Sequence, residues 1–171
     1  VVLTEHPHSW QDCVRDALIQ REKLELLAQK EHEYIRPILL IQAQDKNGEA
    51  NVDVVKQHLL NDYENISEEW IAISTGQTKE LDDQNLFSPD CKIKIVITVE
   101  ALKEGWDCSF AYILASLQNI QSAIDVEQLL GRVLRMPYAK LRQQNELNKA
   151  YAHVISDSTA KATDNLKDRM V

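Results

Sequence analysis

The chain has few glycines, few cysteines and no long apolar run, and each shortage excludes a class of protein. Its four glycines are too scattered to form the loop ending in Lys-Ser or Lys-Thr that cradles nucleotide phosphates. The three cysteines form no Cys-x-x-Cys pair, which argues against both a zinc site and a disulfide framework. We therefore expect neither a self-contained phosphate-binding loop nor a structural metal. The glycines occupy positions 48, 76, 105 and 131.

Apolar runs and positive charge are also scarce. No run is long enough to cross a bilayer, and no basic and apolar leader begins the chain, so we expect a cytoplasmic protein without a membrane partner. The net charge of −8 weighs against binding nucleic acid non-specifically over the whole surface. A local basic groove is still open, because residues 132–149 hold five basic side chains and one acid.

Short apolar runs alternate with amphipathic segments along the chain. This alternation predicts an α/β fold, in which a parallel sheet is flanked by helices on both faces. Ligands of such sheets gather where the strands end, which singles out Gln42 and Gln44, Thr75-Gly76, and the segment from Thr98 to Asp107. Strands are expected near 38–41, 70–74, 92–99, 110–114 and 152–155, and helices over 9–33, 52–63 and the segment that begins near Ser122.

The segment from Gln128 to Arg135 carries the most informative pattern. Gln128, Arg132 and Arg135 share an arc of roughly 60° on a helix, opposite a leucine and valine face. Gly131 lies near the edge of this polar face. Two arginines on one rigid element suit a transferring phosphoryl group, whose oxygens accept bidentate hydrogen bonds. The alternative is an ordinary amphipathic helix with solvated arginines, and the periodicity alone favours it.

The order of motifs resembles the second RecA-like domain of a superfamily-2 helicase. The segment Thr98 to Asp107 is similar to helicase motif V, and Gln128-x-x-Gly131-Arg132-x-x-Arg135 is similar to motif VI. The closer resemblance, over roughly residues 9–156, is to the Res subunit of type III restriction enzymes. It implies a helical segment over 1–35, a RecA-like domain over 36–156 and a polar tail over 157–171.

The resemblance also implies roles for matching residues. Arg132 and Arg135 would be arginine fingers that reach the γ-phosphate of ATP, and Gln128 and Gly131 would lie beside the nucleotide with them. Gly105 and Asp107 would also contact the nucleotide, with Asp107 accepting hydrogen bonds from the ribose. Thr75, Gly76 and Thr98 would contact nucleic-acid phosphates. Many members place the motif V threonine where this chain has Val99.

The missing phosphate-binding loop and acidic metal-holding motif imply that a first RecA-like domain holds ATP and Mg²⁺. We therefore expect the chain to be the second half of an ATP-dependent motor acting on duplex DNA. Its expected partners are that first domain and a DNA-methyltransferase (Mod) subunit, with any endonuclease activity outside these residues. Two alternatives are an RNA helicase domain and a non-catalytic RecA-like nucleic-acid binding module.

Overall fold

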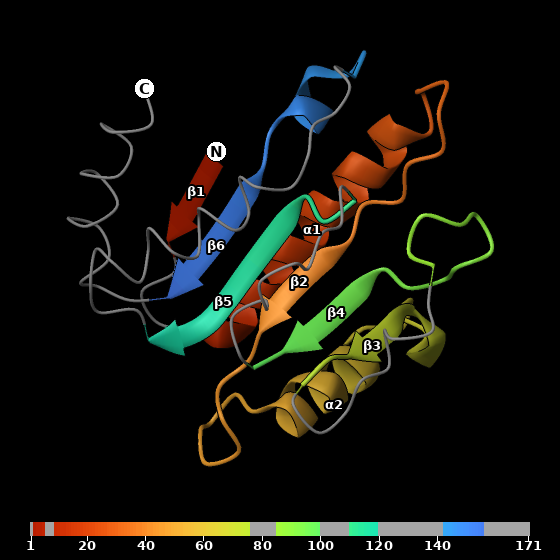
Figure 1. The fold of residues 1–171 in the computed structure, drawn as a ribbon. Helices are drawn as coiled ribbons and strands as arrows, with labels where there is room; N and C mark the ends of the chain where they lie inside the picture. The colour runs from red at the N-terminus through yellow and green to blue at the C-terminus, as the bar shows by residue number, and fades with distance from the viewer. Residues whose placement is uncertain (1, 6–8, 76–84, 100–109, 120–141, 156–171) are drawn as a thin grey trace.

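Six parallel strands form one sheet, and the strand order is β1-β6-β5-β2-β4-β3 (Figure 1). This confirms the predicted α/β class with a parallel sheet. In chain order the strands are β1 (Val2–Glu5), β2 (Leu39–Gln42), β3 (Ile71–Ile73), β4 (Ile95–Thr98), β5 (Ile113–Asn119) and β6 (Tyr151–Ile155). The computed structural model describes residues 2–5, 9–75, 85–99, 110–119 and 142–155.

The central strands are buried on both faces, as their unbroken apolar sequences predict. Every residue of β2 and β4 is buried, and β2 pairs with β4 on one side and with β5 on the other. Parallel strands covered on both faces have this composition, because no side is left for polar residues to meet water. The core of the domain therefore runs through β2, β4 and β5.

In the described part of the chain, two α-helices lie on one side of the sheet. Helix α1 (Trp10–Ala28) begins at Ser9, whose side chain accepts a hydrogen bond from the Asp12 amide at 3.3 Å. Helix α2 (Val52–Asp62) begins at Asn51, whose side chain accepts from the Val54 amide at 3.0 Å. Both side chains satisfy amides that a helix start leaves without partners. Trp10 of α1 meets His58 of α2 edge to face, with ring centroids 5.0 Å apart, so the two helices share one face. Two short 3₁₀ helices cover Glu68–Trp70 and Asn145–Asn148.

Two strands differ from the sequence-based expectation. The sequence predicts β5 over 110–114, whereas the strand runs from Ile113 to Asn119. It predicts only helix before residue 36, whereas β1 lies in that stretch and pairs with β6. The predicted arginine helix, which would cover the second face, and the predicted tail over 157–171 lie outside the described residues.

Candidate functional site

The carboxyl edge of the sheet carries a row of polar side chains in its interior. Gln42 ends β2, Thr98 ends β4, and Ser116 lies in register with Gln42 on β5. All three are buried, and Ser116 Oγ donates a hydrogen bond to Gln42 Oε1 at 2.8 Å. A hydroxyl and an amide that satisfy each other can be buried without the cost of an unpaired polar group. Residues in register on adjacent parallel strands point to one face, so the three form a single polar row.

This row lies on the sheet face opposite α1. His153 of β6 is in register with Ala115, one residue before Ser116, and its Nε2 lies 2.7 Å from Gln20 Oε1 on α1. Successive residues of a strand point to opposite faces. The α1 face therefore carries His153, and the polar row of Gln42, Thr98 and Ser116 belongs to the other face.

Two glutamines connect the strand ends beyond this row. Gln118 Nε2 donates to the carbonyl oxygens of Ala43 at 3.0 Å and of Val99 at 2.7 Å. Gln44 Nε2 donates to the Leu117 carbonyl oxygen at 3.0 Å. Two side chains thus join the residues that follow β2 and β4 to the end of β5. Gln44 is among the strand-end residues that the sequence predicts, whereas Gln118 is not, because the predicted strand ends at residue 114.

The two described threonines of the predicted nucleic-acid contact lie at neighbouring strand ends. Thr98 is the last residue of β4, and Thr75 follows β3 by two residues. The amide of Ser74 donates to the Ile97 carbonyl oxygen at 2.9 Å, which joins these two ends. Thr75 is half-buried, whereas Thr98 is only 6% exposed. Thr75 is therefore the more exposed of the two residues.

The other predicted site residues lie outside the described part of the chain. They are Gly76, Gly105, Asp107, Gln128, Gly131, Arg132 and Arg135. Residues 142–149 of the predicted basic stretch are described, and they include Arg142, whose Nη1 lies 2.7 Å from Glu33 Oε2. The backbone amide of Gln144 donates to Glu31 Oε1 at 2.9 Å. Two acids from the segment after α1 thus bind this stretch, and Glu33 offsets the positive charge of Arg142.

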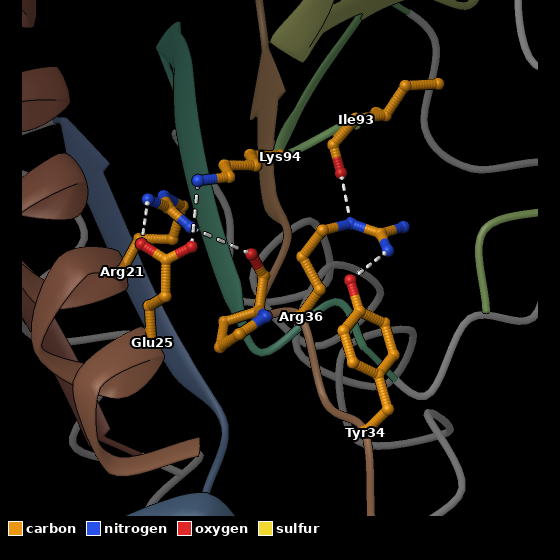
Figure 2. Close-up of polar contacts among 7 residues, drawn as sticks. Arg21, Glu25, Tyr34, Arg36, Ile93 and Lys94 are labelled. Atoms are coloured by element: carbon orange, nitrogen blue, oxygen red, sulfur yellow. Dashed lines mark hydrogen bonds and ion pairs between the residues drawn. The ribbon is translucent and has the colours of Figure 1, made fainter. Parts of the chain in front are cut away.

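Charged side chains cluster at the opposite, amino edge of the sheet (Figure 2). Glu25 pairs with Arg21 at 3.1 Å and with Lys94 at 2.9 Å, and Lys94 Nζ lies 4.0 Å from the centre of the Trp70 ring. Burial raises the pKa of Glu25, but the Lys94 hydrogen bond and the charges of Arg21 and Lys94 outweigh it and lower the pKa overall. This cluster joins α1 to the start of β4 and lies away from Thr98.

A second buried cation at the amino edge is Arg36. Its Nε donates to the Ile93 carbonyl oxygen at 2.7 Å, and its Nη1 donates to the Tyr34 hydroxyl at 3.0 Å (Figure 2). Nη1 also donates to the Ser88 carbonyl oxygen at 3.0 Å. The guanidinium also lies 5.8 Å from the centres of the Tyr34 and Phe110 rings. With its donors used by neighbouring backbone, Arg36 holds the segment before β4 against the start of β2.

A cavity of 520 Å³ lies beside the Glu25 cluster, between α1 and the segment after α2. It is large enough for a small ligand. Its arginines, however, already have acidic partners: Arg15 Nη1 lies 3.3 Å from Asp12, and Arg21 is bound by Glu25. The cavity is lined by Ile95 at the start of β4, whereas Thr98 ends that strand, so the cavity lies at the opposite edge of the sheet from the predicted phosphate contacts.

The side chains at the carboxyl edge are hydroxyls and neutral amides, which do not suit a metal ion. They are the hydroxyls of Thr75 and Thr98 and the amides of Gln42, Gln44 and Gln118, and Gln44 and Gln118 already donate to backbone carbonyl oxygens of the domain. Mg²⁺ prefers carboxylate, phosphate and water oxygens. No cluster of histidine, cysteine or acidic residues that could hold a metal occurs among the described residues. Likewise, no helix in the described ranges has the length and apolar character needed to span a bilayer.

Comparison with known proteins adds no assignment. No protein-family model matches the chain, and no curated protein matches it significantly.

Proposed function

We propose that the chain is the second RecA-like motor domain of an ATP-dependent DNA helicase or translocase, of the kind found in type III restriction enzyme Res subunits. The observation that carries the proposal is the position of the motifs relative to the sheet. The motif V-like segment follows the carboxyl end of β4, the arginine motif follows that of β5, and both strands pair with β2. Segments that follow adjacent parallel strands begin at one edge, where ligands of α/β sheets bind.

Under this proposal the chain supplies half of an ATP site. ATP and Mg²⁺ would be held by a first RecA-like domain, and Mg²⁺ would offset phosphate charge there. Arg132 and Arg135 would bind the γ-phosphate when the two domains close, and Gln128, Gly105 and Asp107 would contact the rest of the nucleotide. Charge developing on the transferring phosphoryl group would then meet two permanently charged guanidiniums.

The nucleic-acid contact would lie at the ends of β3 and β4. Thr75 is half-buried there, and its hydroxyl would contact a phosphate oxygen without reading sequence. The acidic net charge limits non-specific attraction, so the contact would depend on a few positioned donors. A duplex DNA substrate and a methyltransferase partner are part of this proposal.

The deciding experiment measures ATP hydrolysis by the full-length protein that contains this chain, with duplex DNA and Mg²⁺ present. Arginine fingers contribute about 10³ to 10⁵ in rate, so Arg132→Ala and Arg135→Ala should abolish measurable turnover while DNA binding stays close to normal. Arg15→Ala is the matched control, because Arg15 is 56% exposed and pairs with Asp12 on α1.

Three outcomes would contradict parts of the proposal. Wild-type turnover in Arg135→Ala would exclude the finger role. A full-length protein without a phosphate-binding loop and without ATPase activity would instead be a non-catalytic binding module. Stimulation by duplex RNA and not by duplex DNA would make it an RNA helicase.

A further inference from the structure

Gln118 is held at a break in the ladder between β5 and β6. Ser116 is in register with Val154, whereas Asn119 is in register with Ile155. Two residues of β5, Leu117 and Gln118, therefore lie between partners that are adjacent on β6. Irregularities of this kind bend a strand and redirect its side chains. Here the side chain of Gln118 reaches the residues that follow β2 and β4.

The contacts of Gln118 use the whole donor capacity of its amide. A primary amide nitrogen carries two hydrogens, and Gln118 Nε2 donates to the carbonyl oxygens of Ala43, at 3.0 Å, and Val99, at 2.7 Å. Both carbonyls lie one residue beyond the end of a strand. The Ala43 amide in turn donates to the Thr98 carbonyl oxygen at 2.7 Å. Gln118 thus binds the points where the chain leaves β2 and β4.

Gln44 makes the reciprocal connection. Its Nε2 donates to the Leu117 carbonyl oxygen at 3.0 Å, and its Oε1 accepts from the Ala50 amide at 2.9 Å. Gly48 lies against this side chain so closely that a Cβ there would come within 2.5 Å of Gln44 Cβ. The glutamine pair Gln44 and Gln118 therefore joins the ends of β2, β4 and β5 into one cross-linked unit.

This unit contains the start of both motif-bearing segments. The segment with Gly105 and Asp107 begins after Val99, and the segment with Arg132 and Arg135 begins after Asn119. We propose that Gln118 is a positioning residue that couples nucleic-acid binding to ATP hydrolysis, by fixing the starts of these two segments relative to each other. The inference rests on the proposed function and adds a residue to which no motif points.

The test compares the full-length wild-type protein with Gln118→Met, which keeps the length of the side chain and removes its hydrogen bonds. ATP turnover is measured without DNA and with saturating duplex DNA, and the ratio gives the stimulation. Coupling between sites typically changes binding affinity by about 5- to 150-fold. We expect the stimulation to fall about fivefold or more in Gln118→Met, and similarly in Gln44→Met, which breaks the reciprocal bond.

Gln57→Met is the matched control, because Gln57 is exposed on α2 and should leave the stimulation unchanged. Hydrogen exchange of the full-length protein is a second measurement. Amides within residues 43–51 and 95–99 should exchange several-fold faster in Gln118→Met than in the wild type, whereas those of α1 should not.

The outcomes separate this inference from the function on which it rests. A wild-type protein whose ATPase does not respond to DNA overturns the proposed function and the coupling with it. A wild-type protein that responds, with a folded Gln118→Met variant that responds equally, overturns the inference and leaves the function standing. Misfolding of Gln118→Met alone leaves Gln44→Met to decide, and an unchanged stimulation in that variant also overturns the inference.

Discussion

Lys94 Nζ lies 2.9 Å from Glu25 Oε1, and this contact joins the residue before β4 to the last turns of α1. Glu25 also binds Arg21, which is only 5% exposed and donates to the Pro37 carbonyl oxygen at 3.2 Å. One carboxylate therefore pairs with two cations at the amino edge of the sheet. The stability of the contact between α1 and the sheet should therefore depend on the negative charge of Glu25.

Replacing Glu25 with glutamine tests this dependence. Glu25→Gln removes both ion pairs and leaves the buried Arg21 without its carboxylate, so we expect the free energy of unfolding to fall by about 1–3 kcal/mol. Chemical denaturation measures the change. Glu22→Gln, exposed on the same helix, is the control and should change stability by less than about 0.5 kcal/mol. Equal effects of the two substitutions would exclude a special role for Glu25.

The free energy of unfolding should also depend on pH, because Glu25 is protonated in acid. Although burial raises the pKa of this carboxyl, its cationic partners lower it below the ordinary value of 4.5 in the folded protein. The unfolded chain then binds the proton more tightly, so this stabilisation is complete above pH 4.5 and is lost as pH falls through the folded pKa. As the pH is lowered from about 6 by about 3 units, the denaturation midpoint should fall more steeply in the wild type than in Glu25→Gln. Parallel pH profiles would contradict this account.

Arg36 should resist conservative replacement. Its planar fork serves three carbonyl oxygens, of Leu86, Ser88 and Ile93, and a lysine ammonium cannot reproduce that geometry. Arg36→Lys should therefore lower the free energy of unfolding by about 2–3 kcal/mol, since buried carbonyls lose their donors. Arg15→Lys, at a surface position, should be nearly neutral when both are compared by thermal unfolding. A neutral Arg36→Lys would show that water replaces the lost donors.

Cysteine reactivity should follow burial. Cys13 is fully buried, and burial, with a smaller effect of Asp16, raises the pKa of its thiol to about 12. The thiolate is the reactive form, and about pH 8 lies about 4 units below the pKa of Cys13, so almost none of this thiol is ionised. Native Cys13 should therefore stay unlabelled by iodoacetamide at this pH. Cys91 is half-buried and should be labelled before Cys13. Mass spectrometry of the labelled peptides distinguishes the two sites, and denaturant should expose Cys13. Rapid labelling of Cys13 in the native protein would contradict its placement.

Local sequence patterns predicted the helices and strands that are determined by residues close together in the chain. Ser9 before a periodic apolar segment predicted the start of α1, and the apolar run around Leu40 predicted β2. Both signals depend on neighbouring residues alone: a side-chain oxygen near free amides, and an unbroken apolar stretch. The last two residues of β5, Gln118 and Asn119, are polar, and their sequence alone predicts a loop. It continues as strand because Asn119 pairs with Ile155 of β6, and the Gln118 side chain finds acceptors in the carbonyl oxygens just after β2 and β4.

The fold and the candidate site likewise have some features that the sequence predicts and others that only the tertiary structure shows. The sequence by itself determined the α/β class, the parallel sheet and the order of motif-like segments, because these follow from periodicity and spacing. The tertiary structure alone decided that Gln42 faces Ser116 and that Gln118 reaches Val99. Those pairs are separated by 74 and 19 residues, and they meet because β2 is inserted between β4 and β5. Strand order depends on long-range pairing, so no local pattern specifies which amide bridges which strand ends.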